Sequence, residues 1–162
     1  MKNRNQNHEG NWRTPIAIKR WIVQTYGKYF DPCPFCCDLE KYNGLTDDWS
    51  KNLNYINPDF DLKIKKAFVE RARIEGLFCG STNIVLIPAT LETKLFHDVI
   101  YPYATKILIP KGRPRFAGIN TKGKYVLDKT GQSGVVIIIF DGKRDLSEPM
   151  PVIETINFNK YL

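Results

Sequence analysis

The sequence predicts an α/β protein with a single domain over residues 12–162, behind a polar lead-in, residues 1–11, that we expect to be disordered. Three observations predict this class. Apolar runs without alternation, which are typical of strands buried on both faces, alternate with helical patterns. The 162 residues are enough for a buried core, and 43% hydrophobic with 25% charged residues is an ordinary globular composition. No internal repeat or compositional break divides the chain.

The first predicted helix covers Ile16–Tyr26, where apolar residues recur at helical spacing. Thr14 is its expected N-cap, and Pro15 takes the first helical position because its fixed φ suits a helix start. Gly27 ends this helix. A short strand over residues 29–31 follows and stops at the prolines behind it.

The rest of the chain alternates strands with amphipathic helices and closes with a strong strand. In order, we expect a strand over Leu53–Ile56, a helix over Leu62–Glu75 stopped by Gly76, a strand over Asn83–Ile87, a helix over Glu92–Tyr103, a strand over Lys106–Ile109, a basic and turn-rich stretch over Gly112–Lys129, and a strand over Gly134–Phe140. This alternation predicts a parallel or mixed sheet. Ligands of such sheets bind at the carboxyl ends of the strands, and the distinctive residues of this chain fall there.

The charge balance favours a polyanionic partner. Lys and Arg number 24 against 17 Asp and Glu, a formal charge of +7, and a basic protein gains affinity for nucleic acid by releasing counterions. No apolar run approaches the roughly 20 residues of a membrane span, and residues 1–10 lack the apolar core of a signal peptide. We therefore expect an intracellular protein with no membrane partner, whose four cysteines are reduced thiols.

The stretch Asn57-Pro58-Asp59-Phe60, directly after a predicted strand, carries the most chemical information. An Asn side chain and the carbonyl beside a proline can both accept hydrogen bonds from an exocyclic amino group. The ring of Phe60 can stack on a flipped base. Taken alone, the same residues also fit a strand-to-helix turn in which Asn-Pro ends the strand and Phe60 belongs to the core.

Seven short motifs follow one another between residues 12 and about 140. They are Trp12-Arg13-Thr14-Pro15, Phe30-Asp31-Pro32-Cys33, Asn43-Gly44-Leu45 with Trp49, Asn57-Pro58-Asp59-Phe60, Leu86-Ile87-Pro88-Ala89, Thr93 to His97, and Gly112-Arg113-Pro114-Arg115-Phe116. In type and order they resemble the motifs of the phage-type DNA N-6-adenine methyltransferase family. The resemblance implies a Rossmann-like class I methyltransferase domain of reduced size, with a mostly parallel sheet and helices on both faces. It also implies a phage or prophage protein in the cytoplasm of a bacterial host.

The resemblance also assigns an activity and a role to each motif. The activity is transfer of a methyl group from S-adenosyl-L-methionine to the exocyclic amine of adenine in double-stranded DNA. The catalytic motif around the adenine would consist of Asn57, Pro58, Asp59 and Phe60. The cofactor would contact Thr14, Pro15, Asp31, Pro32 and Cys33. Its ribose would be bound by an acidic residue, for which Asp38 and Glu40 are the two candidates. The DNA would meet Lys111, Arg113, Arg115, Lys122 and Lys124.

Two alternatives remain at this stage. Asp59 stands where the family has a second proline and adds a negative charge beside the target pocket, which favours a decayed methyltransferase fold that binds DNA or cofactor without turnover. The second alternative is a zinc-stabilised nucleic-acid-binding module, because a zinc ion binds four thiolates in a tetrahedron and the chain has four cysteines. The four thiols are Cys33, Cys36, Cys37 and Cys79, which offer only one Cys-x-x-Cys pair, so we assign no metal ligands.

Overall fold

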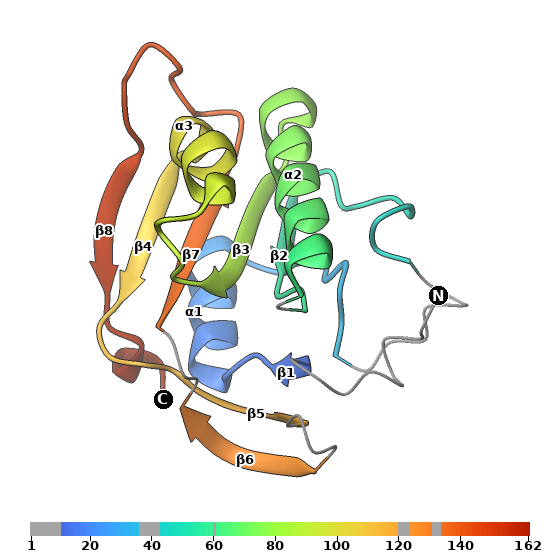
Figure 1. Ribbon diagram of the computed structural model, residues 1–162, viewed down its shortest axis with the longest axis vertical. Coiled ribbons are helices and arrows are strands. Elements are labelled where there is room, and N and C mark those ends of the chain that lie inside the picture. Colours follow the sequence, from blue (N-terminus) through green and yellow to red (C-terminus); the bar gives the residue numbers. More distant parts are fainter. Residues whose placement is uncertain (1–10, 36–42, 60, 120–123, 131–133) are drawn as a thin grey trace.

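In the computed structural model, the residues described are 11–35, 43–59, 61–119, 124–130 and 134–162, and they form an α/β fold with two sheets (Figure 1). The larger sheet has the strand order β2-β3-β7-β4-β8. Its strands are β2 (Leu53–Ile56), β3 (Thr82–Pro88), β4 (Lys106–Pro110), β7 (Val135–Phe140) and β8 (Val152–Ile156). β7 is antiparallel to both of its neighbours, whereas the other four strands run in one direction. The α/β class is confirmed, and the sheet is mixed, less parallel than the resemblance implied.

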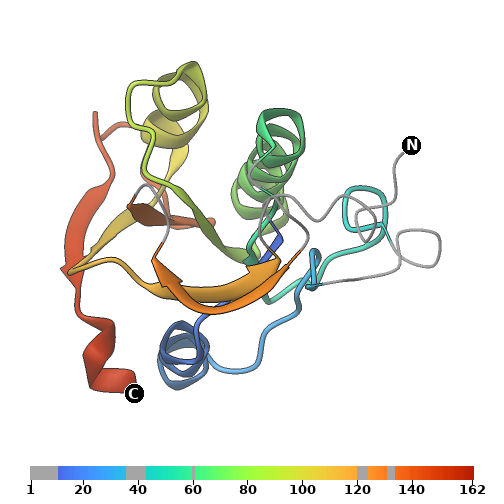
Figure 2. The same cartoon turned by 60° about the horizontal axis from the view of Figure 1, so that its bottom comes forward.

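A smaller antiparallel sheet lies across the carboxyl ends of β2, β3 and β4 (Figures 1 and 2). It has the order β1-β5-β6, with strands β1 (Asn11–Arg13), β5 (Arg115–Ile119) and β6 (Tyr125–Thr130). The sequence predicted only a basic, turn-rich stretch here, because these short strands show neither an apolar run nor a clean alternation. Phe116 of β5 is buried in the same core as helix α1, so the small sheet is joined to the larger one by apolar packing.

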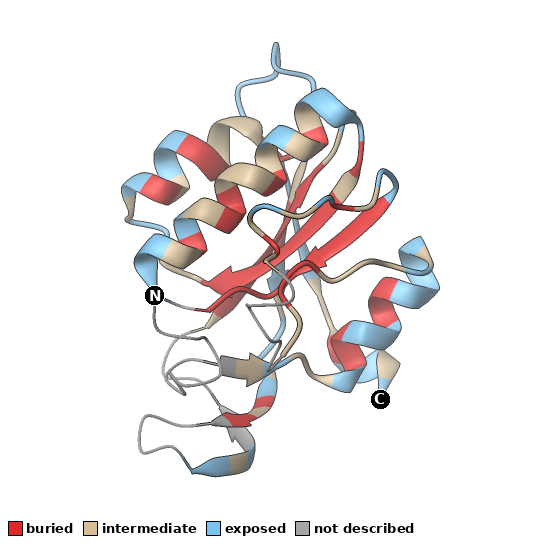
Figure 3. Ribbon diagram, turned by 90° about the vertical axis from the view of Figure 1, so that its right-hand side faces the viewer, coloured by how far each residue is buried: buried red, intermediate tan, exposed pale blue. Residues whose placement is uncertain are grey.

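Helices cover both faces of the larger sheet, as Figures 1 and 3 show. The helical elements are α1 (Ile16–Tyr26), α2 (Leu62–Cys79), η1 (Phe96–Ile100), α3 (Tyr101–Tyr103) and η2 (Phe158–Tyr161). On one face α1 buries Ile18, Trp21 and Ile22 against the strands. On the other face α2 buries Phe68 and Val69, alongside η1 and α3. The buried strands therefore sit between two apolar layers, as their unbroken apolar runs predicted.

Helix α1 has the predicted bounds, but its start differs from the prediction. Pro15 occupies the N-cap position and no side chain caps the helix, so the prediction that Thr14 is the N-cap is wrong. The hydroxyl of Thr14 instead bonds Tyr55 and Asn57 on the larger sheet. Gly27, with φ of 96°, ends the helix as predicted.

Helix α2 passes through Gly76, the residue predicted to stop it, and ends at Gly80 in the left-handed conformation. A Cβ at position 76 would lie 2.8 Å from the backbone of Phe140, so this glycine lets the helix lie against the end of β7. At the other end, Asp61 accepts hydrogen bonds from the backbone N–H groups of Lys63 and Ile64 and caps the helix.

Three further differences concern short elements. The predicted strand at residues 29–31 is a single parallel bridge between Phe30 and Asn54, which sets this segment beside β2. The predicted helix Glu92–Tyr103 begins two residues later, at Lys94, and continues through η1 and α3 to Tyr103. Strand β8 and η2 were not predicted; the side chains of β8 are mostly exposed and give no apolar run. None of the helices in the described residues is long and apolar enough to cross a membrane.

Candidate active site

Asn57 lies at the carboxyl end of β2, facing the segment that links β1 to α1. Its Nδ2 group donates to the backbone carbonyl of Trp12 at 2.9 Å and to Oγ1 of Thr14 at 3.2 Å. Because a carbonyl can only accept, the contact with Trp12 fixes which end of the amide is the nitrogen. The side chain is 8% exposed, so its orientation is set by these two bonds and by packing.

The carbonyl oxygen of the same amide has no such partner. Within the described part of the chain, no N–H or O–H group donates to Oδ1 of Asn57, and this oxygen is not among the fully buried atoms. A nearly buried acceptor normally finds a donor in the protein or in solvent. This oxygen is therefore available to a donor that comes from outside the chain.

Thr14 and Tyr55 complete the support of Asn57. The hydroxyls of Thr14 and Tyr55 lie 2.9 Å apart, and the Tyr55 ring, which is fully buried, meets the edge of the Tyr29 ring at a centroid distance of 5.5 Å. Burial raises the pKa of Tyr55 well above its usual value, and the charge of Asp31 adds to this, while the hydrogen bond with Thr14 acts in the opposite direction. Tyr55 is therefore a neutral phenol that braces Thr14.

The Asp31 segment belongs to the same region. Oδ1 of Asp31 accepts the backbone N–H of Cys33 at 2.9 Å, and both Pro32 and Cys33 are buried. Burial is the larger cause of the raised pKa of Tyr29, and the negative charge of Asp31 is the second cause. The carboxylate is thus close enough for its field to reach the tyrosines that support the Asn57 site.

The Asn43-to-Trp49 element packs directly on this segment. A Cβ at Gly44 would lie 1.6 Å from the carbonyl oxygen of Pro32, so only glycine allows the two backbones to approach this closely. The Gly44 carbonyl accepts Nε1 of Trp49 at 2.7 Å and Nη1 of Arg71 at 3.2 Å. Three motifs that are separate in the sequence, at residues 12–15, 30–33 and 43–49, are therefore near neighbours of the Asn57 site.

The remaining residues of the predicted catalytic and cofactor sets divide into two groups. Pro58 and Asp59 are buried, Asp59 to 6% exposure, in the connection between β2 and α2. This connection is also the strand-to-helix turn that the plainer interpretation of the motif predicted. Phe60, Asp38 and Lys122 lie outside the described residues.

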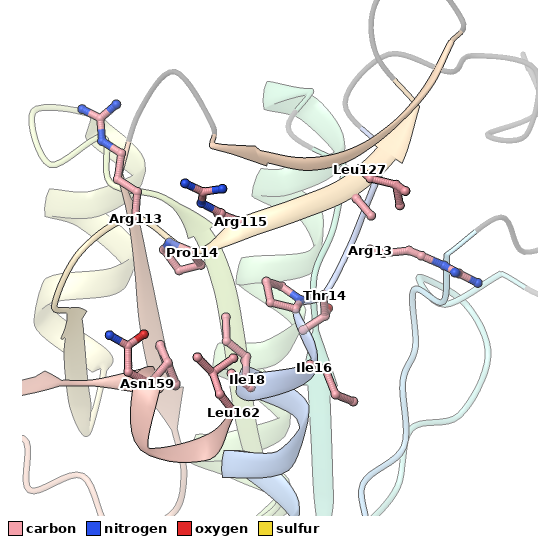
Figure 4. Close-up of a pocket in the computed structure, with 14 residues that line it drawn as sticks. Arg13, Thr14, Ile16, Ile18, Arg113, Pro114, Arg115, Leu127, Asn159 and Leu162 are labelled. Atoms are coloured by element: carbon pink, nitrogen blue, oxygen red, sulfur yellow. The ribbon is translucent and has the colours of Figure 1, made fainter.

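The four predicted DNA-contacting residues that the structure describes are exposed, and only two of them line the same cavity. Arg113 and Arg115, at the start of β5, line a cavity of about 660 Å³ with Arg13, Thr14 and Pro15 (Figure 4). This cavity adjoins the Asn57 site, since Thr14 belongs to both. The two exposed lysines with described positions, Lys111 and Lys124, are not among its lining residues.

The two described thiols lie at opposite ends of the strands of the larger sheet. Cys33 follows the Phe30 bridge, which runs parallel to β2, so it sits at the carboxyl edge. Cys79 ends α2 just before β3 begins, at the amino edge. The seven residues of β3 span roughly 20 Å, so one zinc ion cannot bind both thiolates. In the described residues, no group of three or more His, Cys, Asp or Glu side chains could hold a metal ion.

Sequence reasoning missed three of the groups that build this site. Tyr55 could have been found, because it alternates with Asn57 along one strand and so shares its face. The carbonyl of Trp12 gives no signal in a sequence, since every residue carries one. Arg13 stands in the Trp12-to-Pro15 motif, but its place in the cavity wall depends on the pairing of β1 with β5.

No family model, curated protein or solved structure matches this chain. Its function therefore has to be inferred from the geometry of the site.

Proposed function

We propose that this protein transfers a methyl group from S-adenosyl-L-methionine to the exocyclic amine of adenine in DNA. The observation that carries the proposal is Oδ1 of Asn57, an acceptor without a donor in the described residues, held in place by the two bonds of its own amide nitrogen. An exocyclic amine brings N–H donors and needs acceptors. Asn57 offers one at the carboxyl end of β2, where α/β sheets bind their ligands.

The fold supports a Rossmann-like methyltransferase core of reduced size. β2, α2 and β3 form a βαβ unit with parallel strands, and only β7 reverses direction among the five strands of the sheet. Helices cover both faces. The segments that follow the Phe30 bridge and β2 both belong to the carboxyl edge, so the motifs at residues 30–33 and 57–59 share that edge.

The charges at this edge fit the cofactor. S-adenosyl-L-methionine is positively charged at its sulfonium and its ammonium, and Asp31 supplies a carboxylate that, after burial, adds to the raised pKa of Tyr29 and of Tyr55, the tyrosine that bonds Thr14. We assign the cofactor to Asp31, Pro32 and Cys33, with Thr14 and Pro15 on the other side. When bound, it supplies an electrophilic methyl group.

Asn57 and Pro58 would then orient and activate the amine. Oδ1 of Asn57 and the Pro58 carbonyl would accept hydrogen bonds from its two N–H groups, which draws electron density onto the nitrogen and directs its lone pair at the methyl group. As the N–C bond formed, the S–C bond of the cofactor would break, S-adenosyl-L-homocysteine would leave, and the nitrogen would lose one proton to solvent. The bonds of Asn57 to Trp12 and Thr14 fix the acceptor before the base arrives, so little reorganisation is needed during the reaction. The exposed basic residues, Lys111, Arg113, Arg115 and Lys124, would contact DNA phosphates.

The test is transfer of radiolabelled methyl from the cofactor to unmethylated duplex DNA, followed by nucleoside analysis. We expect the label in N-6-methyladenine. A duplex made only of G·C pairs is the matched control, because cytosine also has an exocyclic amine. Label in that duplex would show a different acceptor base, and absence of label from both would overturn the proposal.

Asp59 favours a second candidate, a protein that binds cofactor or DNA without turnover. Asp59 is nearly buried and follows Asn57 and Pro58 directly in the chain, so an ionised carboxylate there would add a second negative charge to that of Asp31. Calorimetric cofactor binding without methyl transfer would identify this case. Asp59→Asn, which removes the charge and keeps the shape, is then expected to restore transfer.

A further inference from the structure

The cavity beside Thr14 has an apolar floor and a cationic rim (Figure 4). Its apolar side chains come from α1, from β6 and from the end of the chain. Three of them are largely exposed: Ile16 to 57%, Leu127 to 72% and Leu162 to 77%. Apolar side chains gathered in an exposed hollow are characteristic of a binding surface.

The arginines stand on two sides of this floor. Arg113 and Arg115 lie on the β5 side, and Arg13 lies on the opposite side, where its side chain extends outward and its guanidinium is 5.2 Å from the centre of the Phe35 ring. Guanidinium groups bind phosphate oxygens well, with paired N–H donors. S-adenosyl-L-methionine has a net positive charge, from its sulfonium and ammonium against one carboxylate, so the arginines make this cavity a poorer place for the cofactor than the Asp31 side of Thr14 and Pro15.

We propose that this cavity binds an unpaired nucleotide of a DNA strand. The base lies against Ile16 and Leu127, and the phosphates on either side of it meet Arg13 and the Arg113–Arg115 pair. Cations on two opposite sides match a nucleotide that has a phosphate at each end, as in a strand, better than they match a free nucleotide with one. The inference rests on the proposed function in taking DNA as the ligand, and it adds a second nucleotide site that shares Thr14 with the Asn57 site.

The experiment measures binding of a fluorescent oligothymidylate strand by anisotropy. This strand contains no adenine, so its binding does not require the Asn57 site. We expect Leu127→Ser to weaken binding roughly fivefold, the loss of about one apolar contact with a base. Leu146→Ser is the matched control: this leucine is 60% exposed on the connection between β7 and β8, at the opposite end of the sheet, and its replacement should leave binding unchanged.

Two further probes separate base, phosphate and strand. Polyphosphate has no bases, so its binding should be insensitive to Leu127→Ser, and thymidine 5′-monophosphate should compete with the strand only weakly. The proposal is overturned if Leu127→Ser weakens the binding of the strand and of polyphosphate equally, or weakens neither. Strong competition by thymidine 5′-monophosphate would assign the cavity to free nucleotides instead. If oligothymidylate binding depends on Leu127 but adenine DNA is never methylated, the cavity stands and the methyltransferase proposal fails. If adenine DNA is methylated but oligothymidylate binding does not depend on Leu127, the proposal for the cavity fails and the methyltransferase proposal stands.

Discussion

Two buried asparagines three residues apart, Asn54 in strand β2 and Asn57 directly after it, differ in how many of their side-chain hydrogen bonds are made. Asn54, on the face towards α2, uses its whole amide: Oδ1 accepts the Ser50 N–H, and Nδ2 donates to the Ser50 carbonyl and to Oδ1 of Asn83, each at 2.9 Å. Asn57, just beyond the strand, uses only its nitrogen. One asparagine closes a hydrogen-bond network inside the protein, while the other is left with an acceptor at the edge where ligands of α/β sheets bind.

The difference separates a structural polar residue from a candidate binding residue without reference to any relative. Asn83 is equally satisfied, because its Nδ2 donates to the carbonyl of Ala72 at 3.1 Å and to the Ser81 hydroxyl at 3.0 Å. Buried amides with all their bonds made stabilise the fold. The amide of Asn57 is held in place by the hydrogen bonds of its nitrogen, and its oxygen can still accept a hydrogen bond from a ligand.

The largest expected effect is on methyl transfer by Asn57→Ala. Removing the acceptor that orients the amine should lower the transfer rate by roughly a hundredfold or more, as loss of one preorganised polar group does in other enzymes. The rate of label incorporation per folded molecule is the measurement. Asn52→Ala, which changes an exposed asparagine at the other end of β2, is the control and should transfer at the wild-type rate. Unchanged transfer by Asn57→Ala would remove Asn57 from its proposed role.

Asn54→Ala should have the opposite pattern, with a loss of stability and no loss of transfer per folded molecule. It leaves the partly buried Ser50 N–H and carbonyl without the Asn54 amide and leaves Oδ1 of Asn83 with only the Ser81 hydroxyl at 3.4 Å, and unsatisfied buried groups cost on the order of 1–3 kcal/mol each. We expect the free energy of unfolding to fall by about 3 kcal/mol in urea titrations. If this variant is as stable as wild type but inactive, the distinction between the two asparagines is wrong.

Gly44→Ala extends the comparison to backbone contacts at the edge that carries Asn57. The new methyl group would lie 1.6 Å from the Pro32 carbonyl oxygen, a clash between backbones that no rotamer relieves. We expect a loss of about 2 kcal/mol in unfolding free energy, together with weaker cofactor binding because the Asp31–Cys33 segment must move. Gly142→Ala is the control, since its nearest neighbours would be at an ordinary 3.7 Å, and it should change neither quantity.

The same contrast explains how far the sequence could predict this protein. Strands β3, β4 and β7 and helix α1 were found within a residue or two, because burial on both faces leaves an unbroken apolar run in a strand and burial on one face leaves a helical period. The small sheet was missed, since three-residue β1 becomes a strand only through its pairing with β5, about 100 residues later. Gly76 was misinterpreted as a stop because the contact that requires glycine comes from β7.

The sequence proposes the residues of the candidate site, and the structure adds the hydrogen bonds between them. Asn57, Asp31 and Thr14 were all identified from their motifs. The sequence did not show that Thr14 would bond Asn57 in place of capping α1, nor that Trp12 would supply a carbonyl 45 positions away. The motif singles out Asn57 from Asn54, but the sequence does not show which of the two side-chain oxygens is satisfied, because that depends on long-range partners such as Asn83 and Trp12.

The smallest expected effect tests the support beneath Asn57. Tyr55→Phe removes the hydroxyl that bonds Thr14 and should cost about 1 kcal/mol of unfolding free energy near neutral pH. It should also change the response to alkali. Because burial raises the pKa of Tyr55 in the folded protein, its stabilising contribution is complete below its usual value of 10.0 and is lost as the pH rises above that value, where the unfolded chain ionises first.

The wild-type protein should therefore lose more stability than Tyr55→Phe between about pH 8 and about pH 11, measured by urea unfolding at both ends of this range. Lysine and the other tyrosines titrate in both proteins, so the difference between the two pH responses isolates Tyr55. An identical response would mean that the Tyr55 hydroxyl is not held neutral by burial. In that case Thr14 would lack the fixed partner that keeps Asn57 aligned, and the preorganisation attributed to Asn57 would have to come from Trp12 alone.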